Sequence, residues 1–338
     1  TEKIVISLDE AQKAWESKLE KVFPSVSGKD AVKAVLGQEE KMPEFAQNLH
    51  SSVAQKRSEI CTANYGVNVK CSAKPKVVLP VFPGTNCEFD SAKAMEDAGA
   101  ESEIFVINNL TPEGIVKSVN EFASKIKESQ MIFIPGGFSG GDEPEGSGKF
   151  ITAFFRNAEI KEAVTDLLDN RDGLMGGICN GFQALIKLGL VPYGKIIDTD
   201  ENCPTLTFNT IDRHQSRIVH TRIASNKSPW LSLTEVGDVY TVPISHGEGR
   251  FLASEELIRK LAENGQIATQ YVDLEGNATG DVRFNPNDSM YAIEGITSPD
   301  GRVFGKMGHA ERIGSNLYAN VPGEYDMHIF EAGVEYFK

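Results

Sequence analysis

The sequence predicts an α/β fold, in which a parallel sheet is flanked by helices and followed by an antiparallel β addition. From residue 76 to about residue 190, short apolar runs alternate with stretches of helical periodicity, which is the order of a parallel sheet with helices on both faces. Beyond residue 205, apolar and polar residues alternate as they do in half-buried antiparallel strands. A chain of 338 residues also exceeds the usual ~100–200 residues of one domain, so an appended segment is expected.

The first 75 residues are predicted to form a helical arm and linker, and residues 76–338 the main domain. In residues 8–23, LDEAQKAWESKLEKVF, apolar side chains recur near helical spacing, and Pro24 ends the pattern. Residues 28–37 show a second, shorter helical pattern, and residues 42–75 are polar and weakly periodic. Because the chain does not start with Met, we expect a processed chain or a piece of a longer one.

Four apolar runs predict the parallel strands, over residues 76–82, 102–107, 130–137 and 173–178. Helices are predicted over residues 88–99, 111–129 and 150–170, the last as one long helix, and again directly after Cys179. The helix over 111–129 has a clear start, because Thr111 is a good N-cap residue and Pro112 suits the first helical position.

Antiparallel strands are predicted within residues 205–224 and 290–309. In the second region the turn sequence SPDG, residues 298–301, joins two apolar runs. The second run leads into GHAER, residues 308–312, so we expect an extended strand that places His309 and Glu311 on the same side.

Composition argues against several classes of protein. The chain carries 34 Lys and Arg against 48 Asp and Glu, and this net charge of −14 disfavours nucleic acid and anionic membranes as partners. No apolar run approaches the roughly 18–20 residues of a membrane span, and the N-terminus lacks a signal-peptide pattern. The five cysteines are irregularly spaced without a C-x-x-C pair, so neither a zinc site nor a disulfide framework is predicted. We therefore predict a cytoplasmic protein.

Three loops with distinctive residues follow predicted parallel strands. They are PGTNCE at residues 83–88, PGGFSGGDEPEGSG at 135–148 and ICNG at 178–181. Ligands of parallel α/β sheets gather outside the C-terminal ends of the strands, so we expect the functional site where these loops meet.

The last of these loops contains GICNG, residues 177–181, which has the form G-x-nucleophile-x-G. A nucleophile on a sharp turn between strand and helix sits in strained backbone, and small residues on both sides allow the turn to close. The N-terminus of the following helix favours a thiolate, which is the reactive form of cysteine. Cys179 is therefore the candidate nucleophile, and the alternative is a buried structural cysteine beside two glycines.

The glycines of PGGFSGG, residues 135–141, can turn backbone N–H groups toward a carbonyl oxygen. Such donors form an oxyanion hole, for which the N–H of Asn180, directly after the candidate nucleophile, is a natural second member. The alternative is a flexible loop. A phosphate-binding P-loop is rejected, because Phe150 follows Lys149 and Glu143 stands where the motif requires glycine.

Two segments offer a histidine and a glutamate two residues apart. One is GHAER with His309 and Glu311, and the other is SHGEGRF, residues 245–251, in which His246, Glu248 and Arg250 would share one side of an extended segment. A general base must reach the nucleophile, and a carboxylate can orient that base. The residues alone do not decide between the two pairs, and neither segment offers a full set of metal ligands at useful spacing.

Taken together, these segments resemble the triad-type (class I) glutamine amidotransferases, and within them the glutaminase portion of phosphoribosylformylglycinamidine synthases. Five segments in the same order carry the resemblance: FPGTNCEFD, PGGFSGGDEPEGSGKF, GICNGFQALIKLGLVPYG, SHGEGRF and GHAERIG. The resemblance covers about residues 76–320 and implies the flavodoxin-like parallel sheet of that family.

The resemblance also selects the late His and Glu pair. It implies the catalytic residues Cys179, His309 and Glu311, the oxyanion and substrate-binding residues Gly136, Gly137, Asn180 and Gln183, and no metal. Two positions depart from the family pattern: Ala310 stands where the family commonly has proline, and Gly140 where it usually has an aromatic residue.

The activity implied by the resemblance is hydrolysis of glutamine through a cysteine thioester. In the family, the ammonia passes to an ATP-activated amide in a synthetase part, which converts formylglycinamide ribonucleotide to formylglycinamidine ribonucleotide. We therefore expect no cofactor in this chain, ATP and Mg²⁺ in the absent synthetase part, and that part as the partner. Residues 1–75 resemble the tail of a synthetase part, so the chain resembles a C-terminal fragment. The alternatives are another cysteine hydrolase of the same fold and a docking module without activity.

Overall fold

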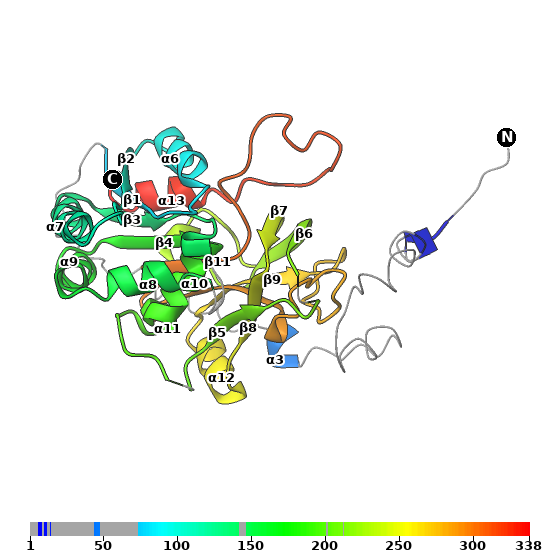
Figure 1. Ribbon diagram of the computed structural model, residues 1–338. Coiled ribbons are helices and arrows are strands. Elements are labelled where there is room, and N and C mark those ends of the chain that lie inside the picture. Colours follow the sequence, from blue (N-terminus) through cyan, green and yellow to red (C-terminus); the bar gives the residue numbers. More distant parts are fainter. Residues whose placement is uncertain are drawn as a thin grey trace.

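The structure is a computed structural model, shown in Figure 1. It describes residues 74–141, 147–200, 202–211 and 213–338, together with residues 6–8, 10–11, 14 and 44–47. The predicted helices over residues 8–23 and 28–37 therefore lie largely or wholly outside the described residues. No helix of the described residues is long and apolar enough to cross a membrane.

A nine-stranded mixed sheet runs through the molecule, in the order β2-β1-β3-β4-β11-β10-β9-β6-β7. Five strands are parallel: β1 (Lys76–Val81), β2 (Glu101–Val106), β3 (Met131–Ile134), β4 (Leu174–Ile178) and β11 (Val303–Lys306). The others continue the sheet in antiparallel fashion: β6 (Gln215–Ile223), β7 (Val239–His246), β9 (Ile267–Val272) and β10 (Ile293–Thr297). A separate pair joins β5 (Thr205–Phe208) to β8 (Glu248–Leu252).

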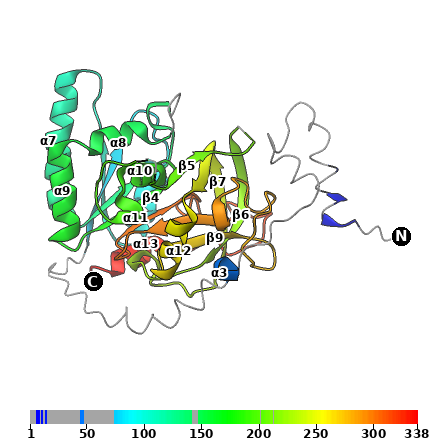
Figure 2. The same cartoon turned by 90° about the horizontal axis from the view of Figure 1, so that it is seen from below.

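Helices cover both faces of the parallel part, which confirms the predicted α/β fold (Figures 1 and 2). On one side lie α6 (Glu88–Asp97) and α13 (Ile329–Glu335), and on the other α7 (Pro112–Glu128), α8 (Lys149–Phe155), α9 (Ala158–Asp169) and α10 (Asn180–Leu188). The remaining short helices are α11 (Leu190–Tyr193), α12 (Glu255–Glu263), η1 (Ser139–Gly141), η2 (Pro229–Leu231) and η3 (Met290–Ala292). Strands β1, β3 and β4 are almost entirely buried between the two helical layers.

Helix α7 begins as the sequence predicts. Thr111 is the N-cap, its hydroxyl accepts a hydrogen bond from the Gly114 N–H at 3.0 Å, and Pro112 is the first helical residue. The predicted single helix over 150–170 is wrong, because it is divided into α8 and α9. Asn157 causes the break: its side-chain oxygen accepts a hydrogen bond from the Glu159 N–H at 3.0 Å and caps a new helix.

The expected strand through GHAER is also wrong. Strand β11 ends at Lys306, and the chain then turns, with the Ala310 N–H donating to the Gly308 carbonyl oxygen at 3.2 Å and the Arg312 N–H to that of His309 at 3.3 Å. Local hydrogen bonds replace the strand ladder here. His309 and Glu311 therefore meet through a turn and not through the alternation of a strand.

A described part of the N-terminal segment, α3 (Glu44–Gln47), packs against the antiparallel part of the sheet. The buried Arg222 side chain of β6 donates hydrogen bonds to the carbonyl oxygens of Ala46 at 3.1 Å and Gln47 at 3.0 Å. In return, the Gln47 amide donates to the Ala278 carbonyl oxygen at 2.6 Å. Arg222 is thus the main polar anchor of this segment.

We predict that Arg222→Met releases α3 from the sheet, because the two carbonyl oxygens lose a charged donor worth about 1–3 kcal/mol. Hydrogen exchange at residues 44–47 should become faster, while exchange in β1, β3 and β4 stays the same. Lys260→Met, which removes only an exposed ion pair with Glu256, is the control and should leave α3 unchanged. Equal exchange at residues 44–47 in Arg222→Met and the unaltered chain would contradict the anchoring role.

Candidate active site

Functional side chains gather at the C-terminal ends of the parallel strands. The loops after β1, β3 and β4 are the three that the sequence singles out, and the turn after β11 lies beside them because β11 pairs in parallel with β4. The site is thus positioned by the sheet order, which brings segments from residues 83–88, 135–141, 177–183 and 306–312 to one edge.

Cys179 occupies a strained turn between β4 and α10. Its backbone has φ 53° and ψ −107°, a conformation that side-chain-bearing residues rarely adopt. Both flanking glycines are sterically required. A Cβ on Gly181 would lie 2.0 Å from the Ile134 carbonyl oxygen, and one on Gly177 would lie 2.8 Å from both the Gly181 backbone and Leu185 Cδ1. The close packing of β3, β4 and α10 therefore holds the cysteine in place.

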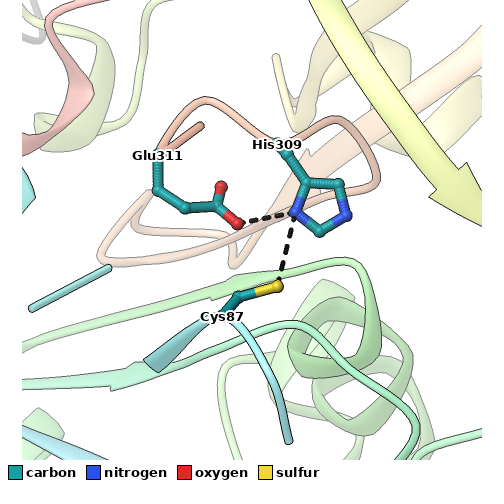
Figure 3. Close-up of side chains that lie close together, drawn as sticks. All are labelled: Cys87, His309 and Glu311. Atoms are coloured by element: carbon teal, nitrogen blue, oxygen red, sulfur yellow. Dashed lines mark hydrogen bonds and ion pairs between the residues drawn. The ribbon is translucent and has the colours of Figure 1, made fainter. Parts of the chain in front are cut away.

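His309 and Glu311 form a buried hydrogen-bonded pair, with 2.6 Å between His309 Nδ1 and Glu311 Oε1 (Figure 3). Burial alone lowers the pKa of His309, but the charge of Glu311 and contacts with Cys179 and Cys87 raise it well above its usual value. Burial raises the pKa of Glu311, and the charge of His309 outweighs this effect and lowers it. Both shifts favour a protonated imidazole hydrogen-bonded to an ionised carboxylate.

Gly136 lies where the cysteine and histidine come together. A Cβ built at this glycine would lie 2.9 Å from His309 Cε1, 3.1 Å from Cys87 Sγ and 3.4 Å from Cys179 Cβ. Cys179 Sγ points toward the Ser245 carbonyl oxygen, 3.7 Å away. Among the described residues, His309 Nε2 has no hydrogen-bond partner, so Cys179 lies beside the imidazole without a hydrogen bond to it.

The loop after β3 is held by the loop after β1. The Gly136 carbonyl oxygen accepts hydrogen bonds from the N–H groups of Asn86 and Cys87, both at 3.3 Å, and the Phe138 N–H donates to the Gly84 carbonyl oxygen at 2.8 Å. Because C=O and N–H point in opposite directions across a trans peptide, the Gly137 N–H points away from Asn86 and Cys87. Gly137 has φ 143°, which favours glycine.

A chain of hydrogen bonds links the remaining predicted site residues. The Asn180 side-chain oxygen accepts from the Ser139 N–H at 3.2 Å, and its amide donates to Gln183 Oε1 at 3.0 Å. The Gln183 amide donates in turn to the Glu248 carbonyl oxygen. Glu248 Oε2 accepts from the Ser147 N–H at 2.9 Å, so the loop after β3 is attached at both of its ends.

His246 is not brought into the Cys179 and Glu311 arrangement. Its ring nitrogens are buried, without hydrogen-bond partners among the described residues, and burial, followed by the charge of His309, lowers its pKa to about 3. The expected extended segment through His246, Glu248 and Arg250 is interrupted, because β7 ends at His246 and β8, in the other sheet, begins at Glu248. Arg250 forms an ion pair with Asp288 at 3.0 Å.

Cys87 and Arg312 are the site residues that the sequence did not single out. Cys87 Sγ lies 3.9 Å from His309 Nδ1 (Figure 3). It also accepts a hydrogen bond from Arg312 Nη2 at 3.0 Å. Cys87 lies in PGTNCE and Arg312 in GHAER, so their positions within the two distinctive loops were the available signals. Burial raises the pKa of the Cys87 thiol, which makes it a weaker nucleophile than an activated cysteine.

Ligand atoms of Cys87, His309 and Glu311 lie within 4.8 Å of one another, a spacing at which a metal ion can be bound. The Arg312 guanidinium, which donates to Cys87 Sγ, places a positive charge against this cluster. A bound cation would also have to displace the proton shared by His309 and Glu311. The cluster is therefore better suited to proton transfer than to metal binding.

Comparison with known proteins gives consistent results. Residues 74–337 match the family of the CobB/CobQ-like glutamine amidotransferase domain. The phosphoribosylformylglycinamidine synthase subunit PurQ of Methanococcus maripaludis is 38% identical over 254 residues, which are 75% of this chain and 86% of that protein. The same subunit of Aquifex aeolicus is 32% identical over 248 residues, 73% of this chain and 95% of that protein.

Among solved structures, PurLQS from Thermotoga maritima is similar at a TM-score of 0.57 and 25% identity, over 78% of this chain and 100% of that chain. The resemblance seen in the sequence motifs is thereby confirmed. The chain belongs to the CobB/CobQ-like glutamine amidotransferase family, as a relative of the PurQ subunits of phosphoribosylformylglycinamidine synthase.

Proposed function

We propose that this chain is the glutaminase of a phosphoribosylformylglycinamidine synthase, with Cys179 as nucleophile and His309 and Glu311 as its catalytic partners. The observation that carries the proposal is the placement of Cys179 on a strained turn beside a buried imidazolium–carboxylate pair. The imidazolium stabilises negative charge on the cysteine sulfur, which favours its attack on the side-chain amide of glutamine.

The proposed reaction proceeds in two steps. Cys179 attacks as the thiolate, so that its Sγ forms a bond with the amide carbon while the carbonyl π electrons move to the oxygen. As the carbonyl reforms and the C–N bond breaks, His309 transfers its proton to the leaving nitrogen, which departs as ammonia. The neutral His309 then accepts a proton from a water molecule that attacks the γ-glutamyl thioester, releasing glutamate. Glu311 holds the Nδ1 side of the ring throughout, which leaves Nε2 for the proton transfers.

The N–H groups of Gly137 and Asn180 are proposed to hold the oxyanion of the tetrahedral intermediate. The orientation of the Gly136–Gly137 peptide supports the first donor, and the position of Asn180 directly after the nucleophile supports the second. Gly136 allows His309 to approach the loop after β3 closely, since a Cβ there would lie 2.9 Å from His309 Cε1. Gln183 is proposed to border the glutamine pocket through its hydrogen bonds with Asn180 and Glu248.

The ammonia is proposed to pass to a synthetase partner that holds ATP, Mg²⁺ and formylglycinamide ribonucleotide, while this chain holds no cofactor of its own. The PurQ name of the relatives supports this division of work, since it denotes one subunit of that synthase. We also propose a cytoplasmic location, which is consistent with free Cys87, Cys179 and Cys203 among the described residues.

In the complete enzyme, we predict that Cys179→Ala abolishes product formation from glutamine, by several orders of magnitude, because the nucleophile is lost. Ammonium salts should still support product formation, since the synthetase site is elsewhere. Cys203→Ala, at a cysteine outside the site, is the control and should retain both activities. Equal loss with glutamine and ammonium in Cys179→Ala would point to a structural role for this cysteine, and full glutamine use would remove the assignment.

Glu311→Gln should lower the pKa of His309, because the raising charge is lost while burial continues to lower the pKa. His309 then loses its proton at a lower pH than in the unaltered chain. The alkaline limb of the pH profile of kcat/KM for glutamine should therefore shift toward lower pH. The measurement is a pH profile of glutamine hydrolysis with an NMR titration of His309. Glu255→Gln, which breaks an exposed ion pair with Arg259, is the control. An unchanged alkaline limb in Glu311→Gln would remove Glu311 from its proposed role.

A further inference from the structure

We propose that a buried ion pair, Lys306 with Glu294, positions His309 for catalysis by holding the backbone of Gly308, an inference that rests on the glutaminase function proposed above. Lys306 is the last residue of β11, and Glu294 lies in the neighbouring strand β10. Both side chains are fully buried, and Lys306 Nζ is 3.1 Å from Glu294 Oε1.

The ion pair binds both polar backbone groups of Gly308. Glu294 Oε1 accepts a hydrogen bond from the Gly308 N–H at 2.6 Å, and Lys306 Nζ donates one to the Gly308 carbonyl oxygen at 2.9 Å. The other carboxylate oxygen, Glu294 Oε2, accepts a hydrogen bond from the hydroxyl of Thr269 in β9. The carboxylate is therefore held by three different groups and cannot move without breaking one of them.

The residue before His309 is packed directly against this pair. A Cβ at Gly308 would lie 3.0 Å from both Lys306 Nζ and Glu294 Oε1, and 2.4 Å from Val242 Cγ1. The His309 N–H donates to the Pro243 carbonyl oxygen of β7 at 2.8 Å. Because β11 has already ended at Lys306, these contacts define the backbone from which the imidazole projects.

Stability alone does not account for a buried ion pair at this place. The desolvation of two charges offsets most of their attraction, and apolar residues of similar volume often serve as well or better. Hydrogen bonds to two defined backbone groups add a geometric restraint that an apolar pair cannot provide. The restraint matters here because Gly308 and Ala310 leave the backbone on both sides of His309 without the stiffness of proline. Lys306 and Glu294 are therefore positioning residues that act through His309.

The test compares Lys306→Met with a matched control, Arg302→Met. Arg302 lies just before β11 at the opposite end of that strand and forms ion pairs with Asp172 at 3.1 Å and Asp300 at 2.7 Å. Should Lys306→Met fail to fold because Glu294 is left unpaired, the double variant Lys306→Met with Glu294→Gln replaces it. This variant has no unpaired charge and still lacks the donor to the Gly308 carbonyl oxygen.

The first readout is the NMR resonance of the proton between His309 and Glu311, identified by its loss in His309→Asn. It should shift or disappear in the Lys306 variants and remain in Arg302→Met. The second readout is labelling of Cys179 by a γ-electrophilic glutamine analogue, located by peptide mass spectrometry. The maximal labelling rate should fall about 10–100-fold, which is the loss typical of hydrogen-bond partners that orient metal-binding side chains. The concentration of the analogue that gives half of the maximal rate should change little.

An unchanged resonance and an unchanged maximal rate in a folded Lys306 variant would overturn the proposal, because the ion pair would then only stabilise the fold. An equal loss in Arg302→Met would overturn it as well, since any broken ion pair near β11 would have the same effect. If Cys179 of the unaltered chain is not labelled at all, the proposed glutaminase function fails, and the resonance still decides whether the ion pair positions His309.

Discussion

The backbone of Cys179 is the constraint on which the rest of the site depends. A residue with a side chain is held at positive φ only when its surroundings leave no alternative, and here α10 packs so closely on β3 and β4 that only glycine fits at positions 177 and 181. The helix and the strands thus form a rigid base for one sulfur atom. The loops after β1 and β3 and the turn after β11 are then arranged around this fixed point.

The charges around this point are individually paired, and two of the three pairs are buried. His309 is paired with Glu311, Lys306 with Glu294, and Arg312 with Asp90 at 3.6 Å while it also contacts Cys87. In an environment of low dielectric such pairs cost desolvation energy, but they hold their partners in defined positions.

Local sequence rules predicted the parts of the fold whose causes are local. The strand and helix alternation and the Thr111 cap follow from the local sequence. The G-x-Cys-x-G pattern was recognisable locally, although Gly181 is required by the Ile134 carbonyl oxygen of β3. The break at Asn157 was missed because an apolar pattern continued across a residue that caps a helix. The turn through His309 was missed because β11 ends earlier than its apolar pattern suggests. The roles of Lys306 and Glu294 could not be found, since their contact depends on strand order. Cys87 lies in a distinctive loop, but its contact with His309 joins residues far apart in the chain. Similarly, the residues alone did not separate His309 from His246, and the separation came from the family resemblance. In the structure both histidines are buried, and the difference lies in the hydrogen bond between His309 and Glu311.

The central claim is that Cys179, and not the neighbouring Cys87, carries the glutamyl group during turnover. Both cysteines lie close to His309, so covalent attachment distinguishes them directly. The measurement is rapid acid quench of the complete enzyme during glutamine turnover, followed by mass spectrometry of its peptides. We expect a γ-glutamyl thioester on the peptide that contains Cys179, and an unmodified Cys87. A glutamyl group on Cys87, or glutamine turnover without any adduct on Cys179, would contradict it.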